Sequence, residues 1–162
     1  MKRLIATLNF LAALAIAAVA LPVAAADLVY DSFLDDVFAG NIVKTDTFKC
    51  LLTTSGYTED RGAHTKRSDV TNEVTGTGYT AGGNTVTFTF TKDTTNHRNR
   101  ITVAATSWTS STITARKMVC YKSRGGLASA DELVFVNDFG SDVSTTSGTL
   151  TVNSSTIDFN TP

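Results

Sequence analysis

The chain has 162 residues, with 14 basic and 15 acidic side chains and a formal net charge of −1 at pH 7. A charge this close to zero excludes long-range electrostatic attraction to nucleic acid or to an anionic membrane surface. Thr is abundant, and Pro occurs only twice. Because Thr is β-branched and suits the exposed face of a pleated sheet, the composition predicts a compact all-β protein rather than a disordered one.

The first 26 residues have the organisation of a secretory signal peptide. A basic start at residues 1–3 is followed by the almost unbroken apolar run 4–21 and then by Pro22. Ala24 and Ala26 have the small side chains that fit the pockets of a signal peptidase. We therefore expect cleavage after Ala26.

Removal of this leader leaves residues 27–162, which carry 12 basic and 15 acidic side chains because Lys2 and Arg3 are lost. The alternative is a retained anchor: at about 1.5 Å per residue, a helix over residues 4–21 nearly crosses a bilayer core. If the leader is retained, residues 1–26 are the part of the chain that we expect to contact a membrane.

One short helix is predicted near the start of residues 27–162. Asp31 or Ser32 can cap its first turn, and Gly40 can end it. The spacing of the apolar residues between them gives one stripe. The stripe consists of Phe33, Leu34, Val37 and Phe38. These side chains either pack in the core or form the buried part of a subunit contact, and they are the candidate interface residues.

From residue 47 the apolar residues recur with a period of two, which is typical of strands. Strands are predicted at residues 47–53, 86–90, 101–105, 113–121, 133–136, 150–152 and 157–159. We expect the last two to pair as a hairpin, and the polar, glycine-rich residues 55–84 to form a long ordered excursion. Seven or eight strands without an internal repeat predict one β-sandwich or jelly-roll-like domain over residues 27–162.

Cys50 and Cys120 are the only cysteines. An even pair in an exported chain favours a disulfide, whereas both also lie in apolar strand-like runs, where a free Cys behaves as a small core residue. His64 and His97 are the only imidazoles, and no cysteine–histidine spacing of a zinc site is present. The sequence predicts no metal site and no cofactor.

Two further groups are weak candidates for ligand binding. A basic turn between residues 92 and 100 offers a place for an anion, although a solvated hairpin end is the commoner role. Its members are Lys92, His97, Arg98 and Arg100. Tyr79 and Trp108 have the aromatic faces that sugar sites use, although they also suit the core or its rim. No catalytic motif is present, and we expect no enzymatic activity.

Several short segments follow one another in an informative order. They are Tyr30-Asp31-Ser32-Phe33, Asp46-Thr47-Phe48-Lys49, Arg67-Ser68-Asp69-Val70, Gly76-Thr77-Gly78-Tyr79, Thr112-Ile113-Thr114-Ala115-Arg116 and Asp138-Phe139-Gly140. In this order they resemble a family of small β-rich structural proteins encoded by tailed phages and prophages. The resemblance covers nearly all of residues 27–162.

The resemblance implies a virion component, of the capsid-decorating, head-fibre, neck or tail-associated kind. Such a protein docks to copies of itself and to neighbouring virion proteins, and the family supplies no catalytic residues. This chain departs from the family by its export leader, and by Cys50 and Cys120 at positions where aliphatic residues are expected.

The leader favours a second hypothesis, an exported β-sandwich binding module such as an adhesin or a glycan-binding protein. The expected location is accordingly a virion, or the periplasm or exterior of the cell if the leader is processed. A homo-oligomer is expected on the first hypothesis, and a specific nucleic-acid partner on neither.

Overall fold

The computed structural model describes residues 18–21 and 28–160. This part of the chain contains nine strands and one α-helix, and eight of the strands begin at or after Leu28. The elements are β1 (Ala18–Leu21), β2 (Leu28–Val29), α1 (Ser32–Phe38), β3 (Phe48–Thr53), β4 (Asn84–Val86), β5 (Phe88–Asp93), β6 (Arg98–Val103), β7 (Thr106–Lys122), β8 (Leu133–Val152) and β9 (Ser155–Asn160). The predicted all-β, sandwich-like class with one short helix is confirmed.

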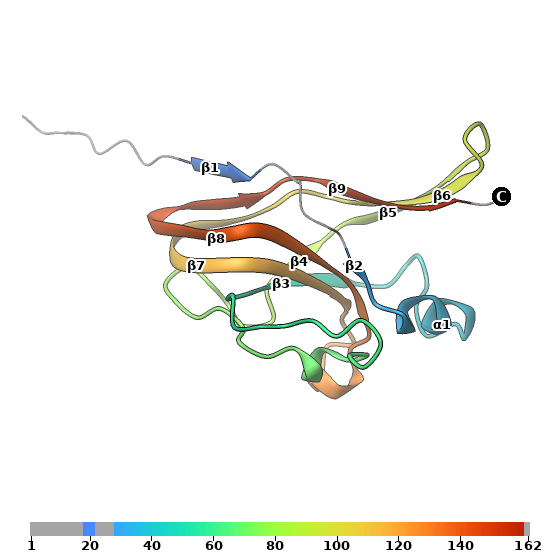
Figure 1. Ribbon diagram of the computed structural model, residues 1–162, viewed down its shortest axis with the longest axis horizontal. Helices are drawn as coiled ribbons and strands as arrows, with labels where there is room; N and C mark the ends of the chain where they lie inside the picture. Colours follow the sequence, from blue (N-terminus) through green and yellow to red (C-terminus); the bar gives the residue numbers. More distant parts are fainter. Residues whose placement is uncertain (1–17, 22–27, 161–162) are drawn as a thin grey trace, which may run out of the picture.

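The strands form two sheets. In the larger sheet the strand order is β1-β8-β7-β3-β4, and β2 also pairs with β8. The smaller sheet has the order β5-β6-β9. Pairing is antiparallel throughout these sheets except between β1 and β8, which run parallel. Figure 1 shows the smaller sheet above β3 and the lower parts of β7 and β8, with α1 at the open right-hand end.

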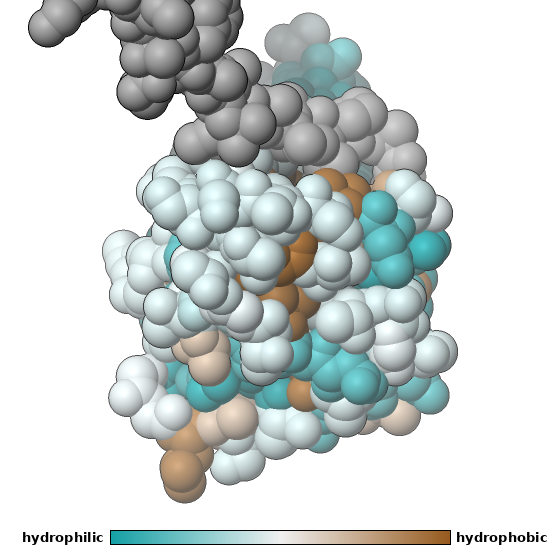
Figure 2. Space-filling model, turned by 90° about the vertical axis from the view of Figure 1, so that its left-hand side faces the viewer, coloured by the Kyte–Doolittle hydropathy of each residue, from teal (hydrophilic) through white to brown (hydrophobic). Residues whose placement is uncertain are grey.

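The long β7–β8 hairpin folds over at the left-hand end of Figure 1, where its register shifts between Trp108 and Ser111. Ser110 and Ser147 have a φ of 50° there, a left-handed backbone that non-glycine residues seldom adopt. The buried Ser111 hydroxyl lies 2.8 Å from Thr145 Oγ1 and 3.1 Å from the carbonyl oxygen of Trp108, and so joins both strands at the bend. Side chains of intermediate hydropathy cover most of this end (Figure 2).

Side chains from both layers meet in the main core. The ring centroids of Phe48 and Phe88 are 4.3 Å apart, and those of Phe88 and Phe135 are 6.2 Å apart. A second apolar cluster lies on the opposite face of the larger sheet. Its buried members are Tyr30, Leu51, Tyr57, Val119, Tyr121, Leu133 and Val136. The larger sheet is therefore covered on both faces, which explains the continuous apolar run at residues 133–136.

The excursion between β3 and β4 covers that second cluster. Arg67 Nε lies 2.7 Å from Asp131 Oδ2, and the carboxylate of Asp69 accepts hydrogen bonds from two backbone amides of its own loop. Gly83 passes so close to β3 that a Cβ there would lie 1.9 Å from the carbonyl oxygen of Cys50, and its φ is +69°. Only glycine fits this backbone, as the sequence of the glycine-rich stretch suggests.

Two of the strand predictions are wrong because the chain changes layers. The predicted strand 86–90 is divided at Thr87 between β4 in the larger sheet and β5 in the smaller one. The expected hairpin of residues 150–152 with 157–159 does not form, since β9 pairs with β6 and not with β8. Apolar side chains before and after each crossing still point into the same core. The alternation of apolar and polar residues therefore continues across the crossing, and the sequence gives no sign that the chain changes sheets.

The leader is described only in part. Residues 18–21, at the end of the run expected to be helical, form strand β1 beside residues 149–152 of β8. The expected cleavage site at Ala24 and Ala26 lies outside the described residues.

A disulfide joins Cys50 to Cys120, which stand opposite each other in the β3–β7 ladder. Both residues are completely buried in the main core. The bond links two adjacent strands of the larger sheet and closes a loop that spans 70 residues of sequence.

We expect the loss of this bond to lower the free energy of unfolding by about 4 kcal/mol, because a loop of 70 residues gains conformational freedom in the unfolded chain. Urea unfolding of the oxidised and reduced wild-type protein measures the effect without changing a side chain, and Cys50→Ala with Cys120→Ala provides a second comparison. Equal stability of the oxidised and reduced forms, or no gain of two hydrogen masses on reduction, would contradict the account.

Candidate functional site

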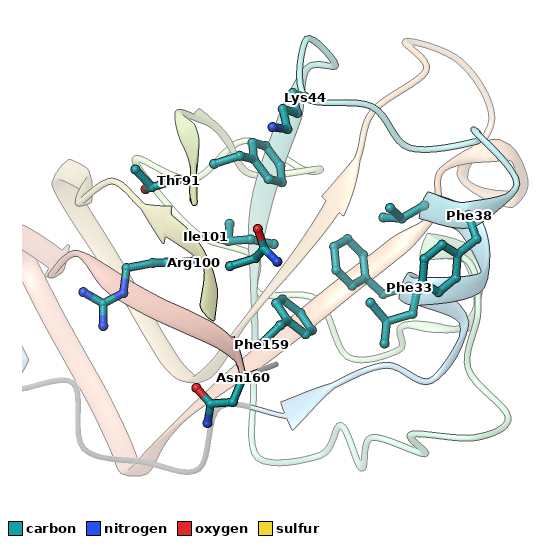
Figure 3. Close-up of a pocket in the computed structure, with 12 residues that line it drawn as sticks. Phe33, Phe38, Lys44, Thr91, Arg100, Ile101, Phe159 and Asn160 are labelled. Carbon is teal, nitrogen blue, oxygen red and sulfur yellow. The ribbon is translucent and has the colours of Figure 1, made fainter. Parts of the chain in front are cut away.

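An apolar groove of about 590 Å³ lies between α1 and the smaller sheet. Its lining comes from α1, from β5 and β6, and from the end of β9. Figure 3 shows Phe33 facing Phe159 across the groove, with Ile101 on the strand beyond, while the guanidinium of Arg100 points away from the apolar centre. The groove lies where the smaller sheet extends past the larger one (Figure 1), and at that end α1 lies opposite the inner face of the smaller sheet.

The floor of the groove belongs to the core. Phe33 is 2% exposed and its ring centroid is 6.1 Å from that of Phe159. Ile101 is buried, and Phe90 and Phe159 are half-buried against the same cluster. These groups are held by the β5–β6–β9 ladder, so the floor is formed by regular secondary structure.

The wall of the groove belongs to α1 and is exposed. Leu34 is 41% exposed, Val37 36% and Phe38 83%. Of the four residues in the predicted stripe, only Phe33 is therefore a core residue. The other three would fill an interface if a partner covered them, because the helix is too short and lies too near the end of the sandwich to bury its whole apolar stripe.

A second hollow of about 550 Å³ continues the apolar surface around the start of α1, between β2 and β9. It shares Leu34 and Phe159 with the groove. At its edge Arg61 forms an ion pair with Asp31, the residue that precedes the helix. Asp31 makes no side-chain cap to α1, so the capping hydrogen bond predicted for Asp31 does not form; its backbone amide donates to the carbonyl oxygen of Arg61 at 3.1 Å.

The basic turn is not an open anion site. Arg100 donates two hydrogen bonds to Asp158, at 2.6 and 2.7 Å. Arg98 lies 2.9 Å from both Asp93 and Asp158. Lys92 and His97 lie with Arg98 around a small hollow of about 320 Å³ that also contains Asp93. The carboxylates already hold the two arginines, and the sequence interpretation of this turn as an anion site is not supported.

The carboxyl groups in this turn are ionised well below neutral pH. Hydrogen bonds from the side chain and backbone of Asn96, with a smaller effect of Arg98, hold the pKa of Asp93 at about 2. Hydrogen bonds from Arg100 lower the pKa of Asp158. Both carboxylates are therefore ionised at neutral pH, where they pair with Arg98 and Arg100.

Tyr79 and Trp108 are not placed to bind a sugar. Trp108 is 2% exposed, and its ring centroid lies 6.3 Å from that of Tyr79. The Tyr79 hydroxyl donates to Glu73 at 2.7 Å and accepts from the Leu52 amide at 3.0 Å. Burial raises the pKa of this hydroxyl and keeps it protonated. The pair fixes the excursion to β3 and belongs to the interior.

Searches of the described residues find neither a group of three potential metal ligands nor a helix that is long and apolar enough to span a bilayer. No protein-family model, curated protein or solved structure matches the chain.

The sequence indicates the apolar stripe of α1, but neither which of its residues stay exposed nor which strands form the floor of the groove. Phe90, Ile101 and Phe159 were each expected on the inward face of a strand, and nothing in the sequence indicated that they meet α1. Their role depends on how far one sheet extends past the other. The only sequence signal is the unusual apolar content of a short helix that ends in Val37-Phe38.

Replacement of Phe33 by Ala should lower the free energy of unfolding by about 3–5 kcal/mol, because it empties a buried site. The matched change Phe38→Ala should alter it by less than about 0.5 kcal/mol, because that ring is exposed. Urea denaturation of both variants measures the difference. Equal losses would show that α1 buries its whole stripe, and that the groove wall is not a free surface.

Proposed function

We propose that this chain is a structural component of a tailed-phage-like particle, and that the apolar groove beside α1 binds a neighbouring protein of that particle. The observation that carries the proposal is the groove itself: an apolar floor fixed by β5, β6 and β9 beside an exposed wall of Leu34, Val37 and Phe38. Exposed apolar surface of this kind marks sites of protein association. Aromatic anchors in such surfaces contribute much of the binding energy.

The groove suits a protein partner better than a charged ligand. Arg100 at its edge is neutralised by Asp158, and Lys44 is the other basic residue of the lining. A partner that inserts apolar side chains removes Phe38 and Leu34 from water, which is favourable by about 25 cal/mol for each Å² that is buried. We therefore expect the occupant to be an apolar or aromatic segment of a folded neighbour.

The segments behind the resemblance support the proposal indirectly, because they build the fold that positions the groove. Arg67 is ion-paired with Asp131, and Arg116 with Asp138. Gly76 and Gly78 pass so close to the β7 backbone that a Cβ at either would lie within 3 Å of it. These residues therefore hold the fold that positions the groove, while the particle role rests on the resemblance itself.

Rigidity also favours docking as the function. The disulfide links the adjacent strands β3 and β7 of the larger sheet. Glu132 accepts hydrogen bonds from Arg124 at 2.8 Å and from Lys66 at 3.2 Å, which ties the excursion to the loop before β8. A surface that is ordered before association loses less conformational entropy when it binds.

The proposal predicts that particles produced by the source cells contain this chain. Particles purified on a density gradient and analysed by mass spectrometry should contain its peptides in a constant ratio to the major capsid protein through successive purification steps. Its absence from purified particles, or a ratio that falls at each step, would overturn the proposal.

The groove is tested by the same measurement with variants. Phe38→Ser with Leu34→Ser should reduce incorporation, because the loss of about 2 kcal/mol of apolar burial weakens association about thirtyfold. Leu127→Ser is the matched control, since Leu127 is 77% exposed on a loop that does not line the groove. Normal incorporation of the groove variant would show that another surface docks.

A further inference from the structure

The free edges of the two sheets differ in how they are protected against association. The edge strand β5 carries Lys92 and Asp93, and the edge strand β9 carries Asp158. Charged side chains on an edge strand oppose pairing with another chain. By contrast, residues 143–152 of β8 contain neither a charged residue nor a proline.

Within residues 18–21 and 28–160, β1 of the leader is the one segment that pairs with the outer side of residues 149–152. β1 runs parallel to β8, with Ala18 opposite Thr149 and Leu21 opposite Val152 (Figure 1). The other side of the same segment pairs with β7, where Trp108 stands opposite Leu150. β1 lies on the amino-terminal side of the cleavage site expected after residue 26. Cleavage after residue 26 therefore removes the strand that hydrogen-bonds to the outer backbone groups of residues 149–152.

We propose that removal of residues 1–26 exposes this edge, and that two processed chains then pair through it in antiparallel fashion, with Thr149 of one copy opposite Thr151 of the other. The proposal goes beyond the particle role and does not depend on it. It depends on cleavage of the leader and on the pairing between β1 and β8.

A second copy fits this edge for two reasons. In an antiparallel arrangement about a two-fold axis, the free N–H and C=O groups of each copy meet those of the other, and the contact closes at two chains. Leu150 and Val152 are buried in the core, which leaves the partly exposed Thr149 and Thr151 as neighbours across the seam. Thr side chains pair favourably across antiparallel strands, and no like charges are brought together.

The leader strand on this account has a second role. In an uncleaved chain it occupies this edge and so opposes pairing between copies. Its sequence, Ala18-Val19-Ala20-Leu21, is uncharged like the edge it covers. Pairing between copies is then coupled to processing.

The test uses the processed protein, isolated from the exported fraction of cells that express the full precursor, with its start at Asp27 verified by intact mass. Sedimentation or light scattering over about 1–100 μM, a range that covers modest association constants, should show a monomer–dimer equilibrium. Thr149→Lys with Thr151→Lys should raise the dissociation constant at least about tenfold, because four lysines would gather at one seam.

The matched control is Thr87→Lys with Thr89→Lys, which places the same charges on exposed positions at the start of the edge strand β5 and outside the groove. This variant should dimerise like the wild type. A monomeric wild-type protein, a retained leader, or a dimer that is broken by the β5 change and not by the β8 change would each overturn the proposal.

A measurement without a variant covers the case in which the lysine substitutions disturb folding. The amides of residues 149–152 should exchange hydrogen slowly in the concentrated processed protein. They should exchange faster on dilution, while the amides of the buried strand β3 keep their protection. Exchange at residues 149–152 that does not change with concentration would overturn the proposal.

Discussion

The fold depends on one constraint: the β7–β8 hairpin must bend across itself so that its two ends lie in different layers. Ser110 and Ser147 take up the left-handed backbone at the bend, and the buried Ser111 hydroxyl holds the two strands together there. Because β8 continues from the lower layer into the upper one, β9 can join the smaller sheet and place Phe159 opposite Phe33. The groove beside α1 and the outer edge of residues 149–152 both follow from this path.

Much of the fold can be predicted from the apolar period. The period of two predicts which faces of β3, β6 and β7 point inward. Gly40 predicts the end of α1, and its φ of +75° is a backbone conformation that favours glycine. The layer crossings cannot be predicted in this way. Val86 and Phe88 keep their alternation across Thr87, because the core lies on the same side of the chain before and after the crossing. Which strands pair with each other depends on contacts between residues far apart in the sequence. The alternation of apolar residues within one strand contains no information about these contacts.

The candidate site, too, can be predicted from the sequence only in part. The apolar stripe of α1 was apparent, yet its partition into a buried Phe33 and an exposed Phe38 depends on where the sheet beneath it ends. The arginines of the basic turn were apparent too, but their partner Asp158 is about 60 residues away in sequence. The sequence left Trp108 open between a ligand site and the core, and the bend of the β7–β8 hairpin places it in the core. In each case the residue type was informative, and the environment depended on the tertiary arrangement.

The central claim is that the groove between α1 and the smaller sheet is a docking surface. Hydrogen exchange of the chain in purified particles, compared with the free processed protein, tests it most directly. Amides of residues 32–38 and 98–101 should exchange at least about tenfold more slowly in the particle, and those of residues 123–130 should be unchanged. Equal exchange at the groove in both states, with protection confined to another face, would contradict the account.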